Sequence, residues 1–200
     1  MYRAVGNRLA VDFDALKLPV SNEKAIAILE SIGFNSMGVD IITDARSLVD
    51  NAKYKRGARL REAPAVFDCS GLIKWLYGLL GIWLPRRSIQ QREIGEIVDF
   101  PNRRPGDIIF CSGCIDYYWQ NPDDGVGHVG IISDRDSVIH AANRKSGVIE
   151  SSIDRFVEND KFRGIRRIVP IQGIHTIEFP LEREVEISDD IRWIVLQKLS

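Results

Sequence analysis

The 200-residue chain is poor in the residues that signal special chemistry, with three histidines, three cysteines and two methionines. Three cysteines cannot all pair with one another, so a disulfide-dense scaffold is excluded. No run approaches ~18 uninterrupted apolar residues, which argues against a membrane-spanning helix. The charges nearly cancel, with 27 basic and 28 acidic residues. A chain this neutral lacks the field that captures nucleic acid or acidic lipid, so we expect neither as a partner.

The remaining composition is that of an ordinary globular protein, 44% hydrophobic and 28% charged, which excludes a disordered chain. Two hundred residues suit one domain, or one domain with an extension. Residues 1–19 have no basic stretch followed by an apolar run, the pattern of a secretion signal. We therefore expect a cytoplasmic protein, with export by a route not encoded in this chain as the alternative. The sequence leaves the oligomeric state open.

Helical patterns fill the first half of the chain and β patterns the second. Helices are predicted over 22–32, 44–54, 68–80 and 88–97, the third being the strongest because its apolar residues form one broad stripe. After Pro105, short β-type runs alternate with turn residues, at 107–111, 128–133, 137–142, 148–151 and 164–170. The tail, 174–200, is either extra strands or a strand and a helix. Helices followed by an antiparallel sheet predict the α+β class.

Cys69 stands at the start of the strongest predicted helix, directly after Asp68, a residue type that can cap a helix. A helix N-terminus carries partial positive charge and unpaired N–H groups. Both stabilise a thiolate, the nucleophilic form of cysteine, and the same groups can bind an oxyanion forming on a carbonyl. The alternative is a buried structural cysteine.

Two of the three histidines, His128 and His140, lie on one predicted hairpin. With an odd-numbered loop centred on Asp134, opposite residues would have numbers summing to 268. His128 would then face His140 with their Cβ atoms ~5 Å apart, whereas an even-numbered loop would break the match. Such a pair is a metal site completed by Cys69, a stacked structural pair, or a general base with its orienting partner. Spacing alone does not separate these interpretations.

Five motifs occur in order along the chain. They are Phe67-Asp68-Cys69-Ser70-Gly71-Leu72, Leu84-Pro85-Arg86-Arg87-Ser88 with Gln90-Gln91 after it, Pro105-Gly106-Asp107-Ile108-Ile109-Phe110, Gly127-His128-Val129-Gly130-Ile131 and Val138-Ile139-His140-Ala141. In this order and spacing, over roughly 44–170, the chain resembles the NlpC/P60 family of cysteine peptidases. Several motifs in the right order are a more specific signal than one short pattern.

The resemblance implies a papain-like α+β fold, with N-terminal helices packed on an antiparallel β-sheet. It implies that Cys69 is the nucleophile, that His128 is the general base and later the acid, and that His140 orients His128. Family members cleave bacterial cell-wall peptides, typically the bond between γ-D-glutamyl and a diamino acid such as meso-diaminopimelate. The implied partner is therefore a peptidoglycan-derived peptide, and no metal or cofactor is required.

The resemblance also places residues around the nucleophile. Tyr54 corresponds to a tyrosine that lines the active site, where its hydroxyl would help to bind the oxyanion. Asp68, Ser70 and Ser88 match positions that contact substrate in some members. The stretch 55–58 departs from the family pattern, which has an aromatic residue and a glycine pair after the tyrosine. The stretch 111–125 resembles an insertion, and it carries three adjacent aromatic residues that could form a wall of the cleft.

The predicted domain organisation is an N-terminal extension (1–43), a catalytic domain (44–170) and a C-terminal extension (171–200). Alternative functions are a papain-like amidase or acyltransferase acting on another amide or a lipid, a delivered toxin or phage wall hydrolase, a binding module with a dead site, and a zinc-binding structural protein. Cys111 and Cys114 have the spacing of a metal or redox pair, but a strand-end and a loop cysteine is the preferred interpretation. Arg86, Arg87 and Arg92 either hold a substrate carboxylate or are simply solvated.

Overall fold

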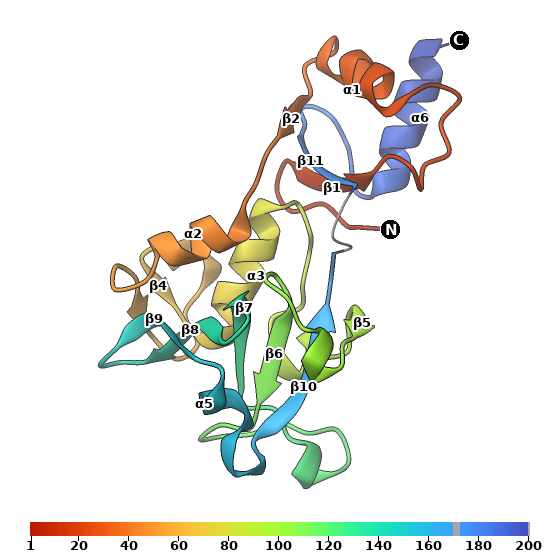
Figure 1. The fold of residues 1–200 in the computed structure, drawn as a ribbon. Helices are drawn as coiled ribbons and strands as arrows, with labels where there is room; N and C mark the ends of the chain where they lie inside the picture. The colour runs from red at the N-terminus through yellow and green to blue at the C-terminus, as the bar shows by residue number, and fades with distance from the viewer. Residues whose placement is uncertain (170–172, 200) are drawn as a thin grey trace. The chain divides into compact units, whose positions relative to one another are not determined.

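The computed structural model describes residues 1–169 and 173–199, which form two compact units (Figure 1). One unit consists of Met1–Asp40, Tyr77–Trp83 and Pro170–Ser200. The other consists of Ile41–Leu76 and Leu84–Val169. The predicted division into a catalytic domain with two terminal extensions stays a prediction. Among the described residues, no helix combines the length and the apolar character needed to cross a membrane.

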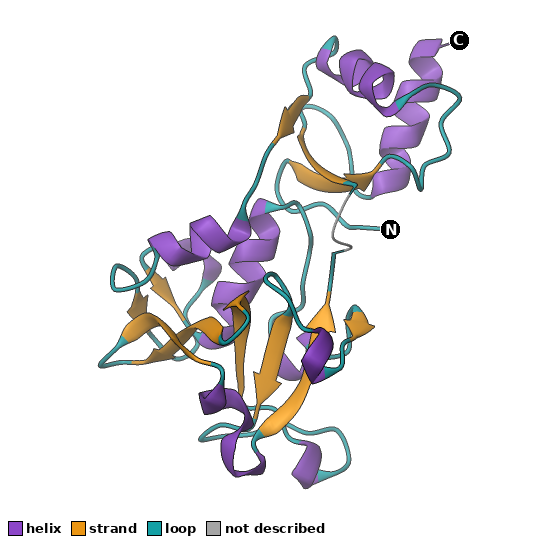
Figure 2. Cartoon of the chain, in the orientation of Figure 1, coloured by secondary structure: helices purple, strands orange, loops and turns teal. Residues whose placement is uncertain are grey.

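The unit that contains both chain ends is a three-stranded antiparallel sheet with two helices (Figure 2). Its strands lie in the order β1 (Arg8–Asp12), β11 (Ile174–Glu178) and β2 (Asn35–Met37). The helices α1 (Asn22–Glu30) and α6 (Ser188–Leu199) contact each other, and α6 contacts β1. The tail is thus a strand and a helix. The core of this unit is formed by fully buried aliphatic side chains that include Leu9, Val11, Leu29, Ile177, Ile191 and Val195.

The other unit is built on a six-stranded sheet in which every neighbouring pair is antiparallel. The strand order is β5 (Glu96–Ile97), β10 (Phe162–Arg167), β6 (Ile108–Cys111), β7 (His128–Asp134), β8 (Ser137–Asn143) and β9 (Gly147–Ser152). Its helices are α2 (Ile41–Ser47), α3 (Cys69–Leu79), α4 (Ser88–Gln91) and α5 (Asp154–Val157), and short strands β3 (Lys53–Tyr54) and β4 (Val66–Phe67) pair in parallel. The α+β class is confirmed.

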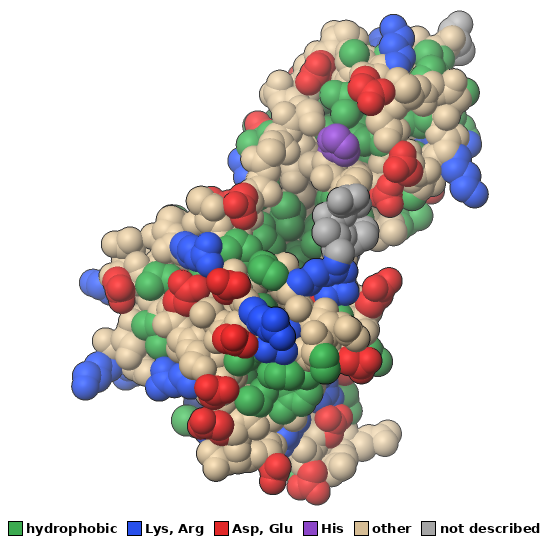
Figure 3. Space-filling model, viewed as in Figure 1, with side chains coloured by type: hydrophobic (Ala, Val, Ile, Leu, Met, Phe, Trp, Pro, Cys, Tyr) green, Lys and Arg blue, Asp and Glu red, His purple; other side chains and the backbone are tan. Residues whose placement is uncertain are grey.

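Packing in this unit follows the apolar pattern of the sequence. The stripe predicted on α3 is buried, with Leu72, Ile73 and Leu76 all fully inaccessible. Ile153 and Phe156, from α5 and the residue before it, pack against buried sheet residues such as Ile109. On the face drawn in Figure 3, acidic and basic side chains are interspersed, as the near-zero net charge indicates.

Two predicted helices are shorter than the sequence pattern indicated. The helix expected over 44–54 ends at Ser47, because the backbone of Asp50 and Ala52 hydrogen-bonds to Val148 of β9 instead of continuing a helix. The helix expected over 88–97 is the single turn α4, and residues 96–97 pair with β10. Gly95, with φ of +85°, makes the bend between them. In both places tertiary strand pairing overrides local helical spacing.

The predicted register of the β7–β8 hairpin is wrong by two residues. The pairs are Ile131 with Ile139 and Ile132 with Val138, whose numbers sum to 270. The turn between Asp134 and Ser137 has an even number of residues, which alone would put the histidines on opposite faces. A bulge between Ile132 and Asp134 adds one residue to β7 and restores the parity. The two histidines consequently lie diagonally on one face.

Candidate active site

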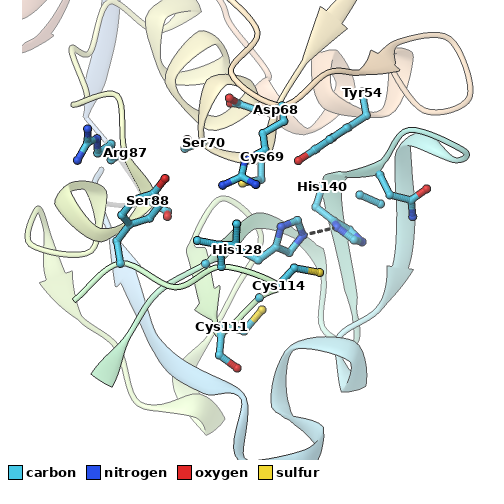
Figure 4. A pocket seen from close by; sticks show the side chains of 18 of the residues that line it. Tyr54, Asp68, Cys69, Ser70, Arg87, Ser88, Cys111, Cys114, His128 and His140 are labelled. Atoms are coloured by element: carbon cyan, nitrogen blue, oxygen red, sulfur yellow. Dashed lines mark hydrogen bonds between the residues drawn. The ribbon is translucent and has the colours of Figure 1, made fainter. Parts of the chain in front are cut away.

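A pocket of about 760 Å³ lies in the unit that contains the six-stranded sheet. Its wall includes every residue to which the family resemblance assigns a part in catalysis or substrate contact. These are Tyr54, Asp68, Cys69, Ser70, Ser88, His128 and His140. Figure 4 shows their side chains around one cavity, although they come from β3, α3, α4, β7 and β8 and the residue preceding α3.

Cys69 is the first residue of α3, and Asp68 caps that helix. Asp68 Oδ1 accepts a hydrogen bond of 2.8 Å from the Gly71 N–H, which satisfies one of the unpaired donors at the helix start. A Cβ added to Gly71 would lie only 2.8 Å from the same oxygen. Glycine at this position therefore permits the cap that presents Cys69 at the helix N-terminus.

The backbone N–H groups of Ser70 and Val129 favour the thiolate of Cys69 and so act to lower the pKa of its thiol. Burial and the neighbouring Asp68 raise the pKa of the thiol to about 11, and the two N–H groups and Arg86 only partly oppose this. A thiol with this pKa is protonated at neutral pH, although a helix N-terminus by itself stabilises the thiolate.

His128 and His140 are hydrogen-bonded to each other. The distance from His128 Nε2 to His140 Nδ1 is 2.7 Å, with the ring planes at 80°. Phe156 stacks on His128 at 5.5 Å between centroids and meets His140 edge-on at 5.1 Å. Burial, with Arg155 nearby, lowers the pKa of His128 to about 4. Burial, His128 and Arg155 lower that of His140 to about 3. Both rings are neutral at pH 7.

The neutral histidine pair makes stability depend on pH. In the unfolded chain both histidines take up protons near pH 6.5, whereas in the folded protein they do so near pH 4 and below. The unfolded state binds more protons in between, so the free energy of unfolding falls as pH drops from 6.5 towards 4, by up to ~1.4 kcal/mol per pH unit for each histidine. Urea unfolding at pH 7, 6 and 5 measures this slope.

The control for this slope is the third histidine, His175, which lies on β11 in the other unit. The double variant His128→Gln/His140→Gln is expected to flatten the dependence between pH 7 and 5, and His175→Gln to leave it largely in place. An unchanged slope in the double variant would contradict the shifted histidine pKa values.

Tyr54, at the end of β3, points into the cavity toward Cys69 (Figure 4). Burial, Cys69 and Asp68 raise the pKa of its phenol, so the hydroxyl keeps its proton and remains a hydrogen-bond donor. Ser88 is a buried residue at the start of α4. These positions suit the roles that the resemblance implies, which stay predictions.

Asp68 and Ser70 already have partners within the protein. Asp68 Oδ2 accepts from the Gly57 N–H at 3.0 Å and pairs with Arg86. Ser70 Oγ accepts from Arg86 at 2.9 Å. Arg86 thus joins the two residues at the helix start and is engaged rather than simply solvated. Their predicted contact with substrate stays a prediction.

Cys111 and Cys114 both lie in the pocket wall, which the sequence did not indicate. Cys111 is directly opposite His128 in the β6–β7 pairing, and opposite residues in an antiparallel pair share a face. Burial and Cys69 raise the pKa of its thiol to about 12. The sequence contains no second motif that would link the spacing of these two cysteines to the site. Only the pairing of β6 with β7 places Cys111 beside His128.

The insertion-like stretch 111–125 also reaches the pocket, where Ile115 and Tyr117 line the wall. Arg87 lies over the Tyr117 ring at 5.4 Å from its centroid. Arg92 is almost fully buried and binds both carboxylate oxygens of Asp124 at 2.7 Å. Of the three arginines weighed from the sequence, Arg92 is therefore an anchor for this loop, and Arg87 remains at the cavity.

A metal centre at Cys69, His128 and His140 does not fit this arrangement. His128 Nε2 and His140 Nδ1 are 2.7 Å apart, which leaves no room for a metal ion between these two nitrogens. Within residues 1–169 and 173–199, no group of three or more histidine, cysteine or carboxylate side chains is arranged to hold a metal ion.

Comparison with known proteins finds relatives that are named as peptidases or hydrolases. A probable endopeptidase of Corynebacterium glutamicum is 31% identical over 132 residues, 64% of this chain and 57% of that protein. A gamma-DL-glutamyl hydrolase of Bacillus subtilis is 35% identical over 102 residues, 50% of this chain and 23% of that protein. The chain thus spans about half the length of the first of these relatives and a smaller part of the second.

Solved structures agree with the sequence comparison. The structure of NlpC2 from Trichomonas vaginalis has a TM-score of 0.53 and 26% identity, covering 64% of this chain and 44% of that one. The papain-like fold expected from the sequence is confirmed by such neighbours. Residues 51–167, more than half of the chain, match the NlpC/P60 family. The chain belongs to the NlpC/P60 family.

Proposed function

We propose that the protein is a cysteine peptidase that hydrolyses peptidoglycan-derived peptides, at the bond between γ-D-glutamyl and a diamino acid. The observation that supports it most is the arrangement of one pocket, with Cys69 at a helix start and the hydrogen-bonded pair His128 and His140 beside it. Family membership supports the reaction class. Of the relatives described above, the Bacillus subtilis protein is named for hydrolysis of a γ-glutamyl bond.

The reaction begins with proton transfer from the Cys69 thiol to His128 Nδ1, as the sulfur attacks the peptide carbonyl carbon. Because both groups start neutral, the transfer accompanies the attack rather than preceding it. His128 then gives the proton to the leaving amine nitrogen as the C–N bond breaks, leaving a thioester. A water molecule, deprotonated by His128, hydrolyses the thioester and regenerates the thiol.

The carbonyl oxygen becomes negative in each tetrahedral intermediate and needs donors at that moment. The Cys69 backbone N–H lies at the start of α3, where it is not used by the helix. The Tyr54 hydroxyl is the second donor in this mechanism. His140 binds Nε2 of the His128 ring and so leaves Nδ1 available to the sulfur, the task that a carboxylate or amide performs in related triads.

The charge of the pocket wall supports an anionic peptide as substrate. The wall contains six basic side chains and a single acidic side chain, Asp68, which is already paired with Arg86. The basic residues are Arg56, Arg59, Arg86, Arg87, Arg155 and Lys161. A γ-linked D-glutamate keeps its free α-carboxylate, and a diaminopimelate adds more. Guanidinium groups bind carboxylates well, which makes such a peptide a better fit than a lipid.

The test is hydrolysis of L-alanyl-γ-D-glutamyl-meso-diaminopimelate by the purified chain, followed by mass spectrometry. We expect the dipeptide L-alanyl-D-glutamate, with its γ-carboxyl released, and free diaminopimelate. The matched control peptide has the same residues joined through the α-carboxyl of D-glutamate. Equal cleavage of both peptides would contradict γ-bond selectivity. Cleavage of a fatty-acyl amide but neither peptide would favour the amidase or acyltransferase alternative.

A further inference from the structure

The hydrogen-bond chain that starts at His128 continues past His140. His140 Nε2 lies 3.0 Å from Ser151 Oγ. The Ser151 hydroxyl in turn donates to the Ser152 carbonyl oxygen at 3.4 Å. Ser151 lies on β9, outside every motif that the sequence analysis singled out. Among the hydrogen bonds of the described residues, Ser151 provides the one side-chain path from the histidine pair to a backbone group.

The three side chains form a diagonal row across three adjacent strands. His140 pairs with Ile149, and Ser151 with Val138, so Ser151 is displaced by two residues from the position opposite His140. His128 and His140 are displaced in the same way on β7 and β8. A displacement of two keeps side chains on one face of a sheet, within reach of long or aromatic groups. Strand register therefore builds the whole row.

The direction of the chain follows from its last member. A backbone carbonyl only accepts hydrogen bonds, so we assign the Ser151 hydroxyl proton to the Ser152 oxygen and not to His140 Nε2. Ser151 Oγ then accepts from His140 Nε2–H. A neutral imidazole carries one proton, so His140 Nδ1 is left as an acceptor and receives His128 Nε2–H. His128 Nδ1 is consequently unprotonated, which is the state that a base for the Cys69 thiol requires.

We propose that Ser151 is a positioning residue that fixes the tautomers of His140 and His128 so that His128 Nδ1 is free to accept the Cys69 proton. This rests on the proposed function only for its catalytic consequence, because the tautomers exist without substrate. With the opposite direction, His128 would carry its proton on Nδ1 and present a donor to the thiol. Ser151 thus distinguishes an active from an inactive arrangement of the same two rings.

The direct test needs no variant. Nitrogen-15 NMR of the wild-type chain with labelled histidine is expected to show His128 and His140 both protonated on Nε2 at pH 7.5. Protonation of either ring on Nδ1 would overturn the proposal. This measurement does not depend on any peptidase activity, so it separates failure of the tautomer assignment from failure of the proposed function.

A second test follows Cys69 through its rate of alkylation by iodoacetamide, read by mass spectrometry of the Cys69 peptide. Ser151→Ala is expected to slow this rate roughly three- to tenfold, the worth of one hydrogen bond. Ser151→Thr keeps a hydroxyl and is expected to restore it. Ser152→Ala is the matched control, because the Ser152 hydroxyl bonds Asp154 while its carbonyl remains in place.

The effect must pass through His140. Combining Ser151→Ala with His140→Ala is expected to give the same alkylation rate as His140→Ala alone. Additional slowing in the double variant, an unchanged rate in Ser151→Ala, or equal slowing in Ser152→Ala would each overturn the proposal. Thermal unfolding of every variant identifies any that lose rate by unfolding, and for those the wild-type NMR result decides.

Discussion

Replacing Cys69 with alanine is expected to lower hydrolysis of the γ-D-glutamyl peptide by about 10⁴-fold or more. In the proposed mechanism the sulfur forms the covalent bond to substrate, and no other group replaces it. The fold is expected to survive, because the change removes one atom at a helix start whose cap is Asp68. Initial rates by liquid chromatography, together with circular dichroism, test both statements.

The matched control for this change is Cys114→Ser, in another thiol of the same pocket wall. Cys114 is exposed and has no step in the mechanism, so its variant is expected to keep most of the activity. Activity that survives in Cys69→Ala, or disappears in Cys114→Ser with the fold intact, would show that the nucleophile has been assigned wrongly.

The second large effect is expected for His128→Gln, with a loss of about 10³- to 10⁴-fold in kcat/KM. Glutamine nearly fills the space of the ring but cannot take the thiol proton. Because burial holds the Cys69 thiol protonated, with its pKa near 11, the reaction depends strongly on a base beside it. The alkylation rate of Cys69 is expected to fall in the same variant, although no peptide is present.

His175→Gln provides the comparison for His128→Gln, because His175 lies in the other unit and contacts Phe13 there. Its kcat/KM is expected to stay within about twofold of wild type, as for changes remote from the site. If His128→Gln and His175→Gln had equal activity, the general base would have to be a different group.

The sequence predicted most of the candidate site residues in the pocket because they lie in short motifs, whereas Tyr54 lies in none of the five. Cys69 is recognisable from the capping residue before it and the apolar stripe after it, and His128 and His140 each open or occupy a short β run. The hairpin register was not predictable, because the bulge near Ser133 leaves no mark in the residue types. The right conclusion about the histidine pair came from the wrong register, since both registers keep the two rings on one face.

Residues that depend on several strands at once were beyond the sequence. Ser151 reaches His140 only through the register of β9 on β8, which follows from a bulge on the neighbouring strand as well as from the turn. The end of α2 was also hidden, because the bonds from Asp50 and Ala52 to Val148 join segments about 100 positions apart. Local spacing carries no information about such distant pairing.

The protonated state of the Cys69 thiol has a consequence for the lifetime of the protein. Peroxides oxidise thiolates far faster than thiols, and oxidation beyond the sulfenic acid is irreversible. A sulfur that becomes anionic only while it attacks a bound carbonyl is exposed to this damage for a small fraction of the time. In the proposed mechanism, the same burial that makes the Cys69 sulfur depend on the imidazole of His128 therefore protects it from oxidation between turnovers.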